Sequence, residues 1–319
     1  MMLNIVLNVE TNSILTMKHK YLISIVGATA IGKTALSIKL AQHFSAPIIS
    51  SDSRQFFKEM KIGTAVPSDE ELNAAPHYFI QNRSIHDNYN VGQFERDALK
   101  KLDELFVDDD IIIMVGGSGL YVDAVLNGLD YFPDVNPDIR KQLNLELAEN
   151  GLKSLQDKLK KLDLDSYESI SIDNPHRLMR ALEICIGTGK PYSYFKNKPK
   201  ADRNFTPIKI GLNADRALMY ERINMRVDIM LKNGLLDEVK SLHQHKELNA
   251  LQTVGYRELF SYLDGERELE FALSEIKKNT RRFAKRQVTW FKKDSEIKWF
   301  DFKTNANTVI EYTNSILKE

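Results

Sequence analysis

The stretch Gly27-Ala28-Thr29-Ala30-Ile31-Gly32-Lys33-Thr34 decides the fold of this chain. It follows an apolar run at 21–26 and precedes a helical pattern at 35–41, which is the setting of a phosphate-binding P-loop. The glycines permit a turn whose backbone N–H groups point inward, Lys33 can reach the outer phosphates, and the Thr34 hydroxyl can ligate Mg²⁺. All eight residues are therefore predicted to hold a diphosphate or triphosphate. The plainer alternative is a tight turn that binds nothing.

Short apolar runs alternate with longer amphipathic segments after this loop. Further strands are predicted at 47–50, 111–115, 207–212 and 296–300, and a helix at 91–106. Strands that alternate with helices form a doubly wound parallel sheet. The predicted fold class is therefore α/β, with a P-loop NTPase-like doubly wound parallel sheet.

Strand signals stop between 130 and 200, where helical segments follow one another at 137–149, 151–162 and 174–187. This pattern predicts a helical insertion domain inside the α/β core. The predicted domains are an N-terminal extension at 1–20, a catalytic core at 21–129 and 201–319 that ends in a basic helix, and the insertion domain at 130–200.

Composition restricts the function without identifying it. The chain is 43% hydrophobic and 28% charged, with 44 basic and 44 acidic residues, and no run is apolar enough to span a membrane. A single cysteine, Cys185, excludes an internal disulfide and a cysteine-rich zinc module. Residues 1–16 lack the features of a secretory signal. We expect a cytoplasmic monomer with no membrane association and no obligate protein partner.

Asp52 follows the second predicted strand, in the sequence Ser50-Ser51-Asp52-Ser53. The carboxyl edge of an open α/β sheet is where ligands bind, so this carboxylate is expected beside the P-loop. It could hold a magnesium-bound water or act as a general base on a substrate. The alternative is a cap for the turn at 53–56.

The third predicted strand leads into a glycine-rich turn at 116–119 and has no aspartate at its end. Most P-loop NTPases hold magnesium partly through such a carboxylate, so its absence argues against an ordinary ATPase. The turn lets the backbone approach a ligand closely, and Ser118 can donate a hydrogen bond to a phosphate oxygen. A plain strand-to-helix turn is the alternative.

Basic residues are concentrated near the end of the chain, where 277–293 carries eight lysines and arginines and no acid. On a helix, 277/281/285 and 278/282/286 stack into one basic face, which suits a polyanion. Arg177 and Arg180 lie one turn apart in the insertion, and Arg222 and Arg226 share a helix face near the sheet. A solvated surface or internal salt bridges would be the alternatives.

Together these features resemble the tRNA dimethylallyltransferase family, whose members modify an adenine beside the anticodon. The resemblance covers nearly the whole chain after residue 20. It is most specific in the P-loop combined with Asp52-Ser53-Arg54-Gln55 and in Ala284-Lys285-Arg286-Gln287. The matching stretches are 27–34, 49–55, 62–65, 91–98, 115–121, 175–183, 254–258 and 284–291.

The resemblance implies transfer of a dimethylallyl group from dimethylallyl diphosphate to the exocyclic N6 of the adenine 3′-adjacent to the anticodon, with release of diphosphate. The P-loop would hold the donor's diphosphate, with Lys33 and Arg226 neutralising its charge and Thr34 ligating Mg²⁺. Asp52 would be the general base. Ser118 stands where the family usually has threonine and would hydrogen-bond the oxygen that links the prenyl carbon to the diphosphate.

The same resemblance implies contacts with the tRNA anticodon stem-loop from three parts of the chain. The residues so assigned are Asp52, Ser53, Arg54, Gln55, Ser118, Arg140, His176, Arg177, Arg180, Tyr256, Arg257, Arg282, Lys285 and Arg286.

Two other functions use the same loop. A small-molecule or nucleoside kinase would bind ATP there, with Asp52 activating a hydroxyl, but it gives no use for the basic helix. A non-catalytic RNA-binding NTPase switch would use the basic helix, but it gives no use for Asp52 beside Ser118.

Overall fold

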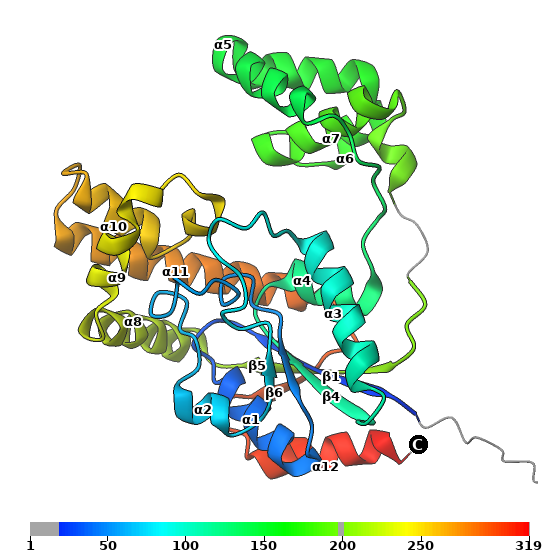
Figure 1. Ribbon diagram of the computed structural model, residues 1–319, viewed down its shortest axis with the longest axis vertical. Helices are drawn as coiled ribbons and strands as arrows, with labels where there is room; N and C mark the ends of the chain where they lie inside the picture. The colour runs from blue at the N-terminus through cyan, green and yellow to red at the C-terminus, as the bar shows by residue number, and fades with distance from the viewer. Residues whose placement is uncertain (1–18, 197–200, 319) are drawn as a thin grey trace, which may run out of the picture. The chain divides into compact units, whose positions relative to one another are not determined.

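A computed structural model describes residues 19–196 and 201–318 of the chain. Its centre is a six-stranded sheet, paired in parallel throughout, with the strand order β3-β2-β4-β1-β5-β6 (Figure 1). This confirms the predicted α/β class. The strands are β1 (Tyr21–Gly27), β2 (Ile48–Ser50), β3 (His77–Tyr78), β4 (Ile111–Val115), β5 (Thr206–Asn213) and β6 (Lys298–Asp301).

The chain divides into two compact units. The larger one contains the sheet and is formed by the residues before Asn127 and after Asp202. Its helices are α1 (Lys33–Phe44), α2 (Asp69–Asn73), α3 (Val91–Leu105), α4 (Gly119–Asn127), α8 (Arg216–Lys232), α9 (Leu235–Leu242), η2 (His243–His245), η3 (Asn249–Leu251), α10 (Tyr256–Leu263), α11 (Leu269–Phe291) and α12 (Ala306–Leu317).

Helices cover both faces of the sheet, because successive residues of a strand point to opposite sides. On one face, Leu22 and Val26 of β1 pack with buried residues of α3, α4 and α11. On the other, Ile23 and Ile25 pack with α1 and α12. Figure 1 shows α1 in blue and α12 in red together below the sheet. The apolar strand runs of the sequence are thus explained by burial on both sides.

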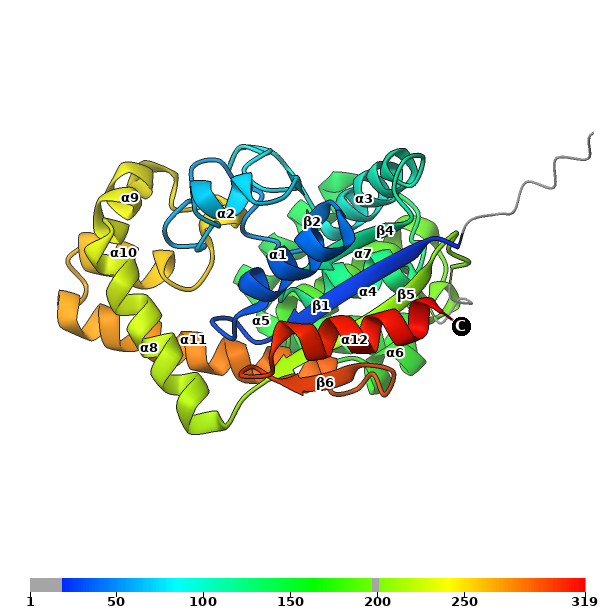
Figure 2. The same ribbon diagram turned by 90° about the horizontal axis from the view of Figure 1, so that it is seen from below.

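A further helical layer, made by α8, α9, α10 and the first half of α11, lies beyond the end of the sheet where β1 stops (Figure 2). Its core includes Val239, Leu259 and Ile276, which are almost fully buried with Phe57 and Met60. Because Phe57 and Met60 belong to the segment that follows β2, this layer anchors the chain next to Asp52.

The smaller unit spans Asn127–Asp202 and has a core of its own. Its elements are α5 (Pro137–Leu162), α6 (Leu164–Ser169), α7 (Pro175–Thr188) and η1 (Tyr192–Phe195). Gly151, with φ 72° and ψ 179°, interrupts α5, and the two helical stretches on either side pack Leu143, Leu155 and Leu159 against α7.

The predicted strands and helices at 21–26, 47–50, 111–115, 207–212 and 91–106 are confirmed to within one or two residues at each end. The two-residue strand β3 was not predicted, because so short a segment carries no periodicity. Within residues 19–196 and 201–318, no helix has the length and hydropathy that a membrane span requires.

Candidate active site

The P-loop begins where β1 ends and is held in an unusual backbone conformation. Gly27 has φ 142°, and a Cβ there would lie 2.5 Å from the carbonyl oxygen of Leu212, so only glycine fits. Gly32 has φ 107°, and Ala30 adopts φ 63° although it carries a side chain. The Ala30 carbonyl accepts a 2.8 Å hydrogen bond from Arg222 Nε, which supports this turn from α8. Positive φ at a non-glycine residue is a form of strain that concentrates at functional sites.

Three strand ends meet at one level of the sheet. Val115 of β4 is paired in register with Ile25 of β1 and with Ser50 of β2. The backbone N–H of Ser51 donates to Val115 O at 2.8 Å, and that of Gly116 donates to Ile25 O at 3.2 Å. The P-loop, the Asp52 segment and the glycine-rich turn therefore leave the sheet side by side, as the sequence predicted for its carboxyl edge.

These three segments surround a cavity of about 470 Å³. The P-loop forms one wall, and α8 and the segment at 64–67 form others. The side chains and backbone that line the cavity include Thr29, Ala30, Ile31, Gly32, Lys33, Thr34, Ser50, Asp52, Gln55, Glu71, Gly116, Arg222 and Arg226. Most of the predicted diphosphate site is thus gathered on one concave surface.

Two cations and one carboxylate dominate the electrostatics of this cavity. Burial lowers the pKa of the Lys33 ammonium to about 8, with attraction by Asp52 opposing the shift and repulsion by Arg226 adding to it. Burial also lowers the pKa of Arg226, against the attraction of Asp52 and Glu71. Lys33 Nζ donates to the carbonyl oxygens of Gly27 at 3.1 Å and Ala28 at 2.7 Å, so it folds back onto its own loop. A bound anion would stabilise both charges.

Asp52 makes the predicted turn cap and also lines the cavity. Its Oδ1 accepts a 3.0 Å hydrogen bond from the backbone N–H of Arg54, which is the predicted turn cap. The same carboxylate lines the cavity with Lys33 and Arg226. Capping through Oδ1 fixes the side chain, and its negative charge attracts both Lys33 and Arg226.

Ser118 is tied to the segment that follows Asp52. Its hydroxyl accepts a 3.1 Å hydrogen bond from the backbone N–H of Ser53 and lies 3.1 Å from Ser53 Oγ, to which it donates. This pair joins the turn after β4 to the turn after β2. Ser118 is therefore positioned beside Asp52, as the sequence predicted, although it does not line the cavity itself.

Arg54 and Gln55 are engaged inside the protein. Arg54 Nη1 donates to the carbonyl oxygens of Asn249 at 3.0 Å and Ala250 at 2.9 Å. Gln55 Nε2 donates to Thr64 O at 3.3 Å and Ala65 O at 3.0 Å. Both side chains shape the walls around Asp52, and only Gln55 of the two lines the cavity.

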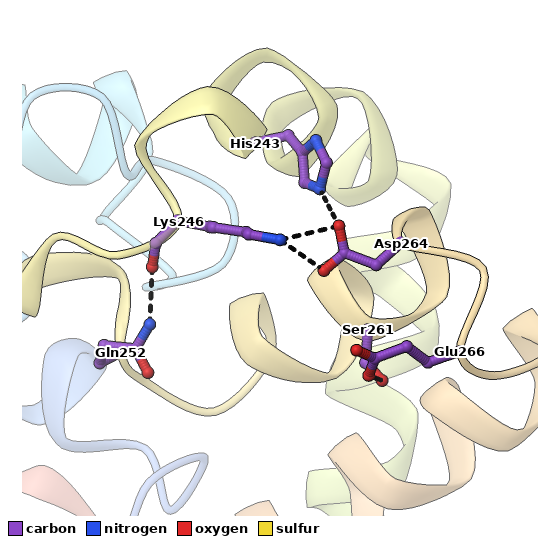
Figure 3. A network of polar contacts seen from close by, with 6 residues as sticks. All are labelled: His243, Lys246, Gln252, Ser261, Asp264 and Glu266. Atoms are coloured by element: carbon purple, nitrogen blue, oxygen red, sulfur yellow. Dashed lines mark hydrogen bonds and ion pairs between the residues drawn. The ribbon is translucent and has the colours of Figure 1, made fainter. Parts of the chain in front are cut away.

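A polar network steadies the segment to which Arg54 is bound (Figure 3). The Asp264 carboxylate binds His243 Nε2 at 2.8 Å and Lys246 Nζ at 2.7 Å. The carbonyl of Lys246 in turn accepts a 2.6 Å hydrogen bond from Gln252 Nε2. These contacts close the turn at 246–252, whose carbonyl groups hold the arginine beside Asp52.

The prediction that Tyr256 contacts RNA is wrong. Its side chain is fully buried, and its hydroxyl donates a 2.7 Å hydrogen bond to Glu238 Oε1. Glu238 also accepts the backbone N–H groups of Lys61, Ile62 and Gly63 at 2.7–2.9 Å. Glu238 of α9 therefore joins Tyr256 of α10 to the segment after β2. The neighbouring Arg257 is exposed.

Only part of the basic helix faces solvent freely. Lys277 pairs with Asp228 at 2.6 Å, Lys278 pairs with Glu275, and Arg281 donates to Asn224 at 2.8 Å. The predicted continuous face is corrected accordingly, because Asp228 and Glu275 neutralise Lys277 and Lys278, and Asn224 holds Arg281 against α8. Exposed cations remain further along the helix, and we define the α11 basic patch as Arg282, Lys285 and Arg286.

The four predicted RNA contacts of the smaller unit lie on α5 and α7. His176 and Arg177 are exposed at the start of α7. Arg140 and Arg180 both pair with the buried Glu183, at 3.1 and 3.6 Å. The pairing fixes the two guanidinium groups on one side of this unit and neutralises part of their charge.

Sequence reasoning assigned no role to Gln287, which contacts the loops of this site, or to Glu71, which lines the cavity near Arg226. From α11 the Gln287 side chain reaches both the P-loop and the glycine-rich turn, as described below. For Gln287 the signal was present: helical phase places 284, 287 and 291 on one face, and a glutamine on an apolar face needs a polar partner inside the protein.

The fold and the cavity define a class of protein, namely one that binds a phosphorylated substrate at a P-loop and sets a carboxylate opposite it. A family model described as IPP transferase matches residues 55–294. The tRNA dimethylallyltransferase of Flavobacterium johnsoniae is 59% identical over 305 residues, covering 94% of this chain and 99% of that protein.

Two solved structures are also similar. The tRNA isopentenylpyrophosphate transferase of Bacillus halodurans has a TM-score of 0.69 and 35% identity, covering 93% of this chain and 95% of that one. A eukaryotic dimethylallyltransferase acting on tRNA has a TM-score of 0.78 and 26% identity, covering 94% of this chain and 80% of that one. This chain belongs to the tRNA dimethylallyltransferase (IPP transferase) family.

The lowered pKa of Lys33 predicts how anion binding depends on pH. Only the protonated ammonium attracts diphosphate, and this proton is lost above about pH 8 in the anion-free protein. Affinity for inorganic diphosphate, measured by calorimetry, should therefore fall above pH 8 by up to about tenfold per pH unit. Lys33→Arg stays charged, so its affinity should fall less steeply. Parallel curves for both proteins would show that Lys33 does not titrate there.

Proposed function

We propose that this enzyme transfers a dimethylallyl group from dimethylallyl diphosphate to the exocyclic N6 of the adenine 3′-adjacent to the anticodon of tRNA, releasing diphosphate. The main observation that supports this proposal is the cavity that the P-loop, Asp52, Lys33 and Arg226 line together. Family membership supplies the reaction class, and the following paragraphs assign the chemistry to residues of this chain.

The donor's diphosphate would occupy the P-loop wall of the cavity. Breaking the allylic C–O bond leaves the electron pair on the diphosphate, so negative charge grows on its oxygens. The P-loop, Lys33 and Arg226 line the cavity and would stabilise that charge. Their partly desolvated state makes each interaction stronger than it would be in water.

Asp52 would accept the proton that the adenine amino group loses. As the new N–C bond forms, N6 becomes positively charged, and transfer of its proton to the Asp52 carboxylate restores a neutral amine. The Oδ1 cap from Arg54 holds the carboxylate in place during this transfer. The allylic carbon of the donor forms its new bond with the lone pair of N6, and the electrons of its broken C–O bond leave with the diphosphate.

Ser118 would hydrogen-bond the oxygen that links the prenyl carbon to the diphosphate. Its hydroxyl is held next to the segment that carries Asp52 by its contacts with Ser53. Rotation of the Ser118 hydroxymethyl group would let it donate its hydrogen bond to the oxygen of dimethylallyl diphosphate instead of to Ser53. Serine keeps the hydroxyl of the family's usual threonine and lacks the methyl group that restricts its rotamer.

The residues present fit Mg²⁺ held mainly by its substrate. In the described part of the chain no three acidic or histidine side chains form a metal cluster. Thr34 lines the cavity at the start of α1, and its hydroxyl would be the protein ligand. Mg²⁺ commonly keeps several waters and binds substrate phosphates with few protein ligands. Bound there, it would reduce the charge of the diphosphate.

The tRNA would be held by charges outside the cavity. The α11 basic patch and Arg257 supply exposed cations in the larger unit. In the smaller unit Arg177 and Arg180 supply exposed cations, the exposed His176 adds a hydrogen-bonding side chain, and Arg140 is half-buried in its ion pair with Glu183. The adenine must leave its stack to reach a carbon in the cavity, which costs a few kcal/mol. Phosphate contacts offset that cost. We therefore propose that the enzyme acts in the cytoplasm.

Mass spectrometry of tRNA tests the proposal directly. Purified enzyme, Mg²⁺ and dimethylallyl diphosphate should add one dimethylallyl group to tRNAs that carry an unpaired adenine after the anticodon. The same tRNA with guanine at that position is the control and should stay unmodified. A kinase would instead consume ATP and phosphorylate a small molecule with no prenyl adduct, an outcome that rejects the proposal.

Asp52→Asn should separate chemistry from binding. The amide keeps the turn cap and cannot take a proton, so kcat should fall by about a hundredfold or more while the Kd for tRNA stays within about threefold. Asp108→Asn, an exposed aspartate at the opposite edge of the sheet, is the matched control and should retain activity. Equal losses in kcat and tRNA affinity would mean that Asp52 is structural.

Replacing Lys285 and Arg286 by alanine should weaken tRNA binding. Two lost phosphate contacts should lower affinity and reduce the slope of log Kd against log salt by about one to two units. The matched control removes Lys277 and Lys278, which carry the same charge on the same helix but pair with Asp228 and Glu275. Equal slopes for the two double variants would show that the patch does not touch RNA.

A further inference from the structure

Gln287 connects two loops of the active site from a third element. Its Oε1 accepts a 2.9 Å hydrogen bond from the backbone N–H of Thr29 in the P-loop. Its Nε2 donates a 2.9 Å hydrogen bond to the carbonyl of Gly117 in the turn after β4. The side chain is 6% exposed, so both contacts are made away from solvent. No other described side chain bonds to both of these loops.

The surrounding residues are shaped to admit this amide. A Cβ on Gly117 would lie 2.2 Å from Gln287 Nε2, so glycine is required for the contact. Two positions further, a Cβ on Gly119 would lie 2.3 Å from the Trp290 ring. Ala284 of α11 is buried together with Ala28 of the P-loop. Helix α11 therefore packs against both loops, and Gln287 makes the polar contacts in this packed region.

We propose that Gln287 is a positioning residue that fixes the spacing between the P-loop and the Ser118 turn. One loop would hold the leaving diphosphate and the other carries the hydroxyl assigned to its bridging oxygen. A shift of either loop would therefore misplace the leaving group against Ser118 and Asp52. The inference rests on the proposed function, because it is this reaction that needs both loops at once.

The chemistry of the two contacts restricts which side chain can make them. Thr29 presents an N–H and requires an acceptor, whereas Gly117 presents a carbonyl and requires a donor. An amide offers both at the right separation. An ionised carboxylate offers only acceptors and would repel the Gly117 carbonyl. A protonated carboxylic acid has the amide's shape and again offers one acceptor and one donor.

Gln287→Glu therefore gives a test that depends on pH. Burial raises the pKa of a carboxyl group, so the introduced acid should be partly protonated near neutral pH. Its kcat/KM for the donor, divided by the wild-type value at each pH, should rise about tenfold between pH 8 and pH 6. Gln287→Met fills the same space without polar atoms and should lose about tenfold or more at every pH. For both variants the Kd for tRNA should stay within about twofold.

Thr280→Val is the matched control, because it removes a 2.7 Å hydrogen bond within the same helix, to the carbonyl oxygen of Ile276, away from both loops. It should keep the wild-type pH profile. Circular dichroism checks that each variant folds. The inference would be overturned if the kcat/KM of Gln287→Glu relative to wild type did not change with pH, or if Gln287→Met kept wild-type activity.

Binding of inorganic diphosphate separates this inference from the proposed function. Measured by calorimetry, it requires no prenyl transfer, and Gln287→Met should weaken it about fivefold or more because the P-loop loses its brace. If the wild-type enzyme binds diphosphate but never prenylates tRNA, the proposed function fails and this measurement still decides the role of Gln287. Unchanged diphosphate affinity in Gln287→Met would count against the bracing role.

Discussion

Close approach of backbone segments at the carboxyl edge of the sheet is the constraint on which the rest of the structure depends. Gly27, Gly116, Gly117 and Gly119 each lack the Cβ that would lie 2.2–2.5 Å from an atom of a neighbouring segment. Because these neighbours are Leu212, Ser51, Gln287 and Trp290, the glycines bring β5, the Asp52 segment and α11 against the P-loop and its adjoining turn. The cavity owes its position to this packing, and glycine here serves close approach as well as turn formation.

The same packing explains the charge distribution of the cavity. Lys33 and Arg226 are held in a partly desolvated space, where their charged forms are disfavoured. Lys33 satisfies its ammonium by donating to two carbonyl groups of its own loop. The cavity lining carries Lys33, Arg222 and Arg226 against the carboxylates of Asp52 and Glu71, so positive charge is in excess and binding an anion would stabilise the site. The missing strand-end aspartate fits this, since a further carboxylate would cancel the excess.

Much of the fold and the centre of the site could be predicted from sequence, because their signals are local. The strands are apolar runs buried on both faces, and the P-loop and Asp52 follow strands whose ends must meet at one edge. Whether a side chain is exposed to solvent depends on contacts between segments that are distant in the sequence. Tyr256 stands in a recognisable stretch, but only the packed structure shows that Glu238 binds its hydroxyl inside the protein. Likewise, the pairing of Lys277 with Asp228 joins helices that no periodicity relates.

Helix α11 shows why a sequence pattern can reveal one face of a helix and miss the contacts made by another face. Its run of cations draws attention to the outer surface, where Lys285 and Arg286 are exposed. The next residue, Gln287, points inward and bonds to two loops that are 258 and 170 residues away in the sequence. One turn of helix thus presents charge to solvent and an amide to the site. A ligand bound to the outer face would also hold the backbone from which Gln287 reaches inward, so one helix relates the exposed basic patch to the two loops.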